Sequence, residues 1–150
     1  MLNKWLINIR FGELNIVSIA DDLVSLQTGG IVVSAGPVLV DEEAENRYMW
    51  GYYLCIENNT PKKIQLVGKD WNITDDKGNR FNDSSMGFKG ELPVLEPGEY
   101  FEYTSYAPLQ AQNAVFYGSC KVKSEGIESN VKVPTFSLSA RNGSKNRILN

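Results

Sequence analysis

The residues with the clearest chemical potential form a short run in the second half of the chain, Ser85-Met86-Gly87-Phe88-Lys89-Gly90. Closely spaced glycines allow backbone N–H groups to converge on an anion, and a lysine beside them adds a positive charge. In dinucleotide-binding loops such glycines lead into a helix whose N-terminus holds the phosphate, but here Glu91-Leu92-Pro93 follows and does not open a helix. The run therefore favours a structural loop that crosses between two sheets, with weak binding of a phosphorylated compound or nucleotide as the alternative.

Groups suited to catalysis or metal binding are few. The sequence contains no histidine, which removes the general base of Ser–His–Asp and Cys–His arrangements and a preferred ligand of zinc and cobalt. The two cysteines, Cys55 and Cys120, have no CxxC spacing. Asp75-Asp76 and the acidic segment 41–45 lack the regular ligand spacing of a calcium loop. We therefore predict no catalytic residue, no metal site and no cofactor.

Length and composition describe one ordinary globular domain. The chain has 150 residues, 42% of them hydrophobic, and a formal net charge of −3, so it can bury its own core and has no basic excess for nucleic acid. No run approaches the ~20 apolar residues of a membrane span, and the N-terminus lacks the features of a secretory signal. We expect a cytoplasmic protein that binds neither nucleic acid nor membrane. Cys55 and Cys120 are expected to be buried free thiols, with a disulfide between facing strands as the alternative.

The segments that must position the glycine-rich run alternate apolar residues with period two, the pattern of antiparallel strands. In residues 47–57 both alternating faces are apolar, which indicates a central strand. Gly36-Pro37 and Gly68 predict interruptions in their strands, and Asp75–Asn79 and Glu96–Glu99 have the composition of tight turns. The expected strands are 31–40, 47–57, 63–66 with 71–74, 100–104, 114–123 and 130–139. About seven strands between residues 31 and 140 predict an all-β, immunoglobulin-like sandwich of two antiparallel sheets.

The two ends of the chain differ from this pattern. Residues 1–30 are predicted to form an extension, in which the apolar positions 2, 5, 6 and 9 have helical spacing. A second short helix is predicted from a cap at Asp21 or Asp22 to Gly29-Gly30. An extra strand is the alternative, because Ile7–Phe11 also alternates. Residues 141–150 are expected to form a flexible tail.

A series of short motifs in residues 31–140 resembles the ApaG domain, called CorD in some bacteria. The motifs are Tyr48 and Tyr52 before Ile56–Asn58, Gln65-Leu66, Trp71–Thr74, Asp76–Gly78, Gly87–Pro93, Leu95–Glu99, Phe101–Ser105, Gly118-Ser119 and Val133–Leu138. The resemblance implies a fibronectin type III-like sandwich. Bacterial members are associated with cobalt resistance and magnesium efflux, and their gene often neighbours a diadenosine-tetraphosphate hydrolase. In eukaryotes the domain occurs within an F-box protein and a polymerase-delta-interacting protein, which implies a protein-binding module.

The chain departs from the family pattern in two motifs, and its residues 1–30 extend beyond what the small bacterial members carry. The glycine loop of the family usually runs G-x-G-V-x-G, whereas here Ser85 occupies the first position and Phe88 the apolar one. A basic residue followed by histidine normally precedes the tryptophan, whereas here Lys69-Asp70 precedes Trp71.

We predict a non-enzymatic protein-interaction module that is linked indirectly to divalent-cation homeostasis. Aromatic side chains beside loops commonly anchor protein interfaces, so Phe88 is predicted to be an exposed contact; for Trp71 the alternative is a place in the core. A small-ligand binder for a phosphorylated compound or nucleotide remains the second hypothesis. The residues predicted to bind a protein partner or an anion are Gly87, Phe88, Lys89, Gly90, Glu91, Trp71 and Tyr103.

Overall fold

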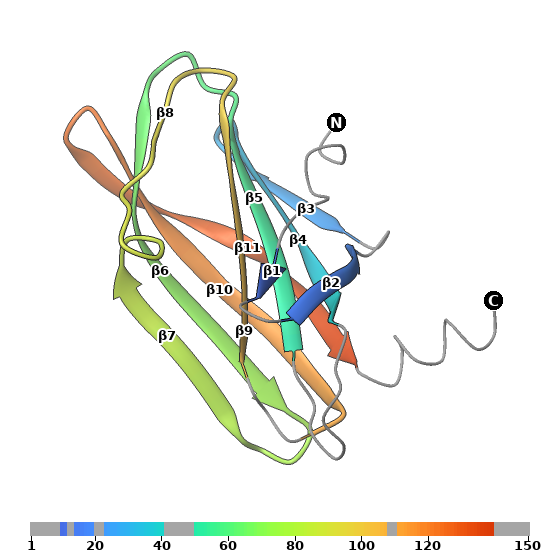
Figure 1. Ribbon diagram of the computed structural model, residues 1–150. Helices are drawn as coiled ribbons and strands as arrows, with labels where there is room; N and C mark the ends of the chain where they lie inside the picture. Colours follow the sequence, from blue (N-terminus) through green and yellow to red (C-terminus); the bar gives the residue numbers. More distant parts are fainter. Residues whose placement is uncertain (1–9, 12–13, 20–22, 41–49, 108–110, 140–150) are drawn as a thin grey trace.

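Two antiparallel sheets packed face to face make up the described part of the protein (Figure 1). The computed structural model describes residues 10–11, 14–19, 23–40, 50–107 and 111–139, and these residues contain no helix. The first sheet is formed by β1 (Arg10–Phe11), β2 (Leu14–Ile19), β3 (Val24–Thr28), β4 (Ile31–Val40), β5 (Trp50–Asn58) and β9 (Tyr100–Ala107). The second is formed by β6 (Ile64–Asp75), β7 (Arg80–Met86), β8 (Val94–Leu95), β10 (Asn113–Ser124) and β11 (Ile127–Ser139). The predicted all-β sandwich is confirmed.

The order of the strands places β7 and β9 at the ends of their sheets. The first sheet runs β1-β2-β4-β5-β9, with β3 also paired to β4, and the second runs β11-β10-β6-β7, with β8 also paired to β6. The predicted central strand is confirmed as β5, whose side chains are buried on both faces, Tyr52 and Leu54 towards the core and Tyr53 and Cys55 on the other side. The glycine-rich run connects β7 to β8 at one edge of the second sheet.

The second helix predicted in the extension is wrong. Val24–Thr28 forms β3, which pairs with Ile31–Ala35 of β4 through a turn at Gly29-Gly30. Both glycines have positive φ, 63° and 132°, and this conformation suits a tight hairpin better than a helix end. Arg10–Phe11 and Leu14–Ile19 are strands as well, as the alternative interpretation predicted for the first of them. The helix predicted over the first nine residues and the tail at 141–150 lie outside the described residues.

Gly36-Pro37 and Gly68 do not end their strands. Pro37 lies where the neighbour of β4 changes, because pairing with β3 stops at Ala35 and pairing with β2 begins at Val38. Pro37 remains opposite Tyr52 of β5, and a proline, which has no N–H, is tolerated where the strand has no partner on its other side. At Gly68 the register between β6 and β10 shifts by one residue, so the predicted interruption is a β-bulge in one long strand.

The predicted turns have the expected backbone. Gly78 has a φ of 87°, and the Asp75 carboxylate accepts hydrogen bonds from the backbone N–H groups of Lys77 and Asn79 at 2.9 and 2.8 Å. Gly98 has a φ of 89°, and the N–H of Glu99 donates to the carbonyl of Glu96 at 2.9 Å, closing the second turn. These turns fix where β7 and β9 begin.

The amide of Asn58 holds together the end of the sandwich where the chain passes from the first sheet to the second. Its Nδ2 donates to the carbonyls of Lys62 and Leu95 at 2.8 and 3.0 Å. Its Oδ1 accepts from the backbone N–H and the hydroxyl of Thr60 at 3.0 and 2.7 Å. The residue is completely buried, and each polar atom of the side chain is therefore satisfied without water.

Both cysteines are free and buried, as predicted. Cys120 belongs to the core between the sheets, whereas Cys55 does not. Burial raises the pKa of each thiol to about 12. Neither is therefore a thiolate at neutral pH, which is the form that acts as a nucleophile.

Candidate interaction site at the glycine loop

The glycine loop, residues 87–91, is closed by its own backbone. The N–H of Gly87 donates to the carbonyl of Val67 at 3.0 Å, and Phe88 and Glu91 exchange two hydrogen bonds at 2.8 and 3.1 Å. Three N–H groups of the loop are thus occupied by carbonyl groups of the same chain. An anion-binding nest needs successive N–H groups that are free to converge. The N–H groups of this loop instead fix its own conformation, and the loop backbone is therefore poorly suited to binding an anion.

Gly87 is required by this geometry. Its φ is 76°, and a Cβ at this position would lie 2.9 Å from the carbonyl oxygen of Glu91. Any other residue would therefore open the hydrogen-bonded pair between Phe88 and Glu91. Gly90 has a φ of 86° but no atom near the place of a Cβ, so its glycine serves the backbone conformation alone.

Phe88 is buried, and the prediction that it is an exposed contact is wrong. Its side chain is 1% exposed and packs edge-on against Tyr103, Phe101 and Trp71, with ring centroids 5.4, 5.5 and 6.1 Å apart. The glycine before it lets the chain turn the ring inwards. The prediction that the loop crosses between sheets is also wrong, because β7 and β8 both pair with β6; the backbone stays with the second sheet, and side chains of the loop reach the first.

Trp71 and Tyr103 lie in the same aromatic cluster, which makes the core alternative for Trp71 correct. Trp71 is completely buried, Tyr103 almost so, and their ring centroids are 6.3 Å apart. Burial raises the pKa of Tyr103, and the nearby indole N–H of Trp71 partly opposes that rise. The two groups do not reach hydrogen-bond geometry, and the indole nitrogen has no partner among the described residues. Neither ring is available to a partner.

Lys69, a buried lysine that the sequence analysis did not select, anchors the loop through hydrogen bonds. The ammonium of Lys69 donates to the carbonyl of Gly87 at 2.8 Å and to the hydroxyl of Ser85 at 2.9 Å. It also lies over the rings of Phe88 and Tyr103, 5.4 and 5.7 Å from their centroids, a cation–π arrangement. Ser85, which replaces a glycine of the family pattern, thus supplies an acceptor for this ammonium.

Lys89 ties the loop to the edge of the other sheet. Its ammonium donates to the carbonyl of Thr104 in β9 at 2.6 Å and lies 5.3 Å from the ring centroid of Tyr103. Desolvation, together with the charge of Lys69, lowers the pKa of Lys89. Because the carbonyl of Thr104 faces away from β5, Lys89 occupies the free edge of β9, where another strand would otherwise pair.

Three apolar side chains are exposed around this anchored loop. Met86, Leu92 and Val94 are 76%, 45% and 48% exposed. Leu92 lies beside Gly87, with its Cδ2 3.5 Å from the place of a Cβ, and Val94 pairs with Gln65, whose amide donates to the carbonyl of Leu92. We call Met86, Glu91, Leu92 and Val94 the loop surface. One sequence pattern could have indicated part of this surface: Val94 is next to Leu95, and the two side chains of a strand pair alternate between an exposed and a buried face.

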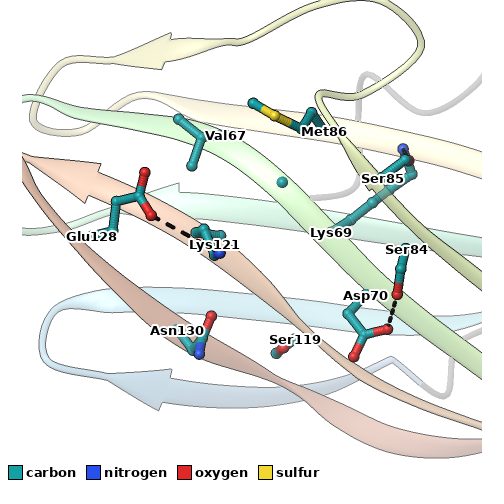
Figure 2. A pocket seen from close by; sticks show the side chains of 11 residues that line it. Val67, Lys69, Asp70, Ser84, Ser85, Met86, Ser119, Lys121, Glu128 and Asn130 are labelled. Carbon is teal, nitrogen blue, oxygen red and sulfur yellow. Dashed lines mark hydrogen bonds and ion pairs between the residues drawn. The ribbon is translucent and has the colours of Figure 1, made fainter.

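A polar hollow adjoins the loop surface on the outer face of the second sheet (Figure 2). It measures about 500 Å³ and is lined by strands β6, β7, β10 and β11. Gly68 contributes no side chain, which leaves the space open. Asp70 stands on one side, where its Oδ1 accepts hydrogen bonds from Ser84 and Asn82. These bonds lower the pKa of Asp70, so it is ionised at neutral pH.

Metal ligands do not gather in the described part of the chain. Groups of three or more histidine, cysteine, aspartate or glutamate side chains that could hold an ion are not found there. The described residues also contain no helix that is long and apolar enough to cross a membrane.

The fold and the loop place this protein in the class of small β-sandwich proteins that carry a glycine loop at the edge of one sheet. The chain belongs to the ApaG family: the model of the ApaG domain matches residues 39–124. It is 38% identical to Protein ApaG of Brucella canis over 120 residues, which cover 77% of this chain and 92% of that protein. Protein ApaG of Parvibaculum lavamentivorans is 35% identical over the same coverage. The crystal structure of the putative ApaA protein from Bordetella pertussis is similar, with a TM-score of 0.68, 31% identity, and 73% of this chain and 92% of that chain covered.

Proposed function

We propose that this ApaG domain is a non-enzymatic protein-interaction module that binds another protein through the loop surface. The observation that supports the proposal best is the cluster of exposed Met86, Leu92 and Val94 around an anchored loop. Single exposed apolar residues are common on any protein, but these three fall within one stretch of nine residues that contains the loop. Methionine is enriched in the core of protein interfaces, where adaptable apolar side chains pack against a partner.

The rigidity of the loop supports the same proposal. Phe88 anchors it in the aromatic cluster, Lys69 binds its carbonyl, and Lys89 binds the opposite sheet. A surface that is already ordered loses little conformational entropy when a partner binds. Any link to cobalt or magnesium homeostasis would then act through the bound partner.

The alternative, a binder of a phosphorylated compound or nucleotide, is supported by the proximity of two ammonium groups. Lys69 and Lys89 both lie within 6 Å of the ring centroid of Tyr103. Against this alternative, each ammonium already donates to a backbone carbonyl. Calorimetry with pyrophosphate and ATP separates the two functions: saturable binding that is lost in Lys89→Ala favours the ligand, and absence of heat favours the module.

Site-specific photo-crosslinking in cells tests the proposed module. A photoreactive amino acid replaces Met86 or Leu92, and the control replaces Ile127, which is 71% exposed at the β10–β11 turn. We expect a discrete crosslinked protein from positions 86 and 92 that is absent at position 127. Identical crosslinking patterns at all three positions, or no crosslink at 86 and 92, would overturn the proposal.

A further inference from the structure

The outer edge of β7 carries backbone groups without a partner in the described part of the chain. The hydrogen bonds from Asp75 to Asn79 and from Gly87 to Val67 mark the two ends of the ladder between β6 and β7. In an antiparallel pair, bonded and non-bonded residue pairs alternate. The backbone groups of Phe81, Asp83 and Ser85 therefore face β6. The groups that face outwards belong to Arg80, Asn82, Ser84 and Met86, whose side chains are exposed.

The two end strands that flank the loop differ in how their free edges are occupied. Lys89 binds the carbonyl of Thr104 on β9, but no described residue beyond β6 pairs with β7. An open strand edge is a template for the backbone of another chain, and recognition domains use this addition of a strand to bind extended peptides. The free edge of β7 is thus the place where a partner segment gains backbone hydrogen bonds beside the loop surface.

The hollow behind β7 supplies charge complementarity. Asp70 forms no ion pair with a described lysine or arginine, whereas the other carboxylate at the hollow, Glu128, is 3.9 Å from Lys121. Lys69 also lines the hollow, but its ammonium is held by Gly87 and Ser85. Of the two carboxylates that line the hollow, Asp70 is therefore the one that forms no ion pair with a described residue.

The distance from the edge to Asp70 fits a long basic side chain. A segment added to β7 would lie one strand spacing from Ser84 and two spacings, about 10 Å, from the backbone of Asp70. Ser84, which is directly opposite Asp70 in the ladder, is small and leaves the path over β7 open. An arginine on the added segment, opposite Ser84 and on the outer face, reaches the Asp70 carboxylate from there.

We propose that the edge of β7 binds an extended segment of a partner protein as an added strand, with an arginine or lysine of that segment placed in the hollow against Asp70. This inference rests on the proposed function, whose loop surface it extends, and names the chemistry of the partner. The strand supplies affinity through Asn82, Ser84 and Met86. The basic residue fixes the register and selects among partners.

A designed peptide tests this proposal on the full chain. The probe is a fluorescein-labelled nonapeptide of alternating threonine and valine with a central arginine. Its twin carries citrulline, which has nearly the same shape without the charge. We expect the arginine peptide to bind at least about fivefold more tightly than the citrulline peptide, as a charge-assisted hydrogen bond requires. Asp70→Asn should abolish that difference, whereas the matched control Glu128→Gln should preserve it.

Amide hydrogen exchange supplies the readout that is specific to an added strand. On binding, the amides of Asn82, Ser84 and Met86 should become protected, while those of Asp83 and Ser85, already bonded to β6, should change little. Unchanged exchange at the first three amides, or an Arg-to-citrulline difference that survives in Asp70→Asn, would overturn the inference. Protection that appears without peptide as the protein concentration rises would assign the edge to a second copy of the chain and also overturn it. Crosslinks at positions 86 and 92 together with failure of the peptide experiment would leave the proposed function standing.

Discussion

Replacement of Asn58 by aspartate should destabilise the fold far more than the loss of one amide suggests. Aspartate keeps an oxygen for the two hydrogen bonds from Thr60, but its second oxygen cannot donate to the carbonyls of Lys62 and Leu95. Two lost hydrogen bonds cost about 2 kcal/mol, and leaving buried acceptors unpaired adds about 1–3 kcal/mol. We therefore expect Asn58→Asp to lower the free energy of unfolding by about 3–5 kcal/mol, a large share of the total of a typical domain.

The effect should depend on pH with a defined sign. A buried carboxylate that faces carbonyl oxygens has its pKa raised above the ordinary value. Because the folded-state pKa then exceeds the unfolded one, the folded variant binds the proton more tightly. The loss in free energy of unfolding, relative to the natural chain, should be largest above the folded-state pKa. It should shrink as the pH falls, because the protonated acid regains one hydrogen-bond donor.

Urea unfolding followed by tryptophan fluorescence measures this prediction at pH 7 and at pH 4.5. Asn59→Asp is the matched control, because it adds the same charge one residue further on at an exposed side chain. A loss below about 1 kcal/mol for Asn58→Asp at pH 7, less than the cost of the two broken bonds, would refute the reasoning. So would equal losses in the two variants.

Two further predictions concern the loop and the outer face of the first sheet. Phe88→Ala should lower the free energy of unfolding by about 3–5 kcal/mol, because it empties the centre of the aromatic cluster; Leu92→Ala, in the same segment but exposed, should cost less than about 1 kcal/mol in the same urea titration. Glu102→Gln should raise the melting temperature at pH 7. Burial raises the pKa of Glu102 against the opposing hydrogen bond from Tyr53, so its contribution to stability is present below the unfolded pKa and is lost as the pH rises through the folded pKa. The glutamine variant keeps an acceptor for Tyr53, and its advantage should disappear near pH 4; an advantage that is equal at both pH values would contradict this explanation.

The fold was predictable because strand periodicity and turn chemistry agree in most of the chain. Both faces of β5 are apolar in the sequence, and Gly78 and Gly98 occupy the positions where their turns need positive φ. The helix predicted to end at Gly29-Gly30 was wrong because Leu23 and Leu26 fit helical spacing while Val24–Thr28 also alternates. Pairing with β4 decides between helix and strand, and this pairing cannot be predicted from the short segment alone.

The site was less predictable, since its geometry depends on residues distant in sequence. Glycines beside Phe88 indicate a turn but not the direction of the ring, which is set by Tyr103 and Phe101 on the other sheet. Lys69 stands next to Asp70 in the sequence, yet the carbonyl of Gly87, 18 positions later, accepts its hydrogen bond. Met86, Leu92 and Val94 are ordinary apolar residues of strands and their connection until the position of the sheet edge is known.

The pairing between β6 and β10 has a consequence for synthesis of the protein on the ribosome. The nearest paired residues of these strands, Asp75 and Ala114, are 39 positions apart. At about 5–20 residues per second, β6 waits roughly 2–8 s for its central partner. During that interval β6 can pair only with β7 and β8 within its own sheet. Its apolar face, which includes Trp71 and Ile73, lacks the core residues that β10 and β11 contribute. The interval before β10 emerges from the ribosome is therefore one in which the nascent chain is exposed to misfolding and to chaperone binding.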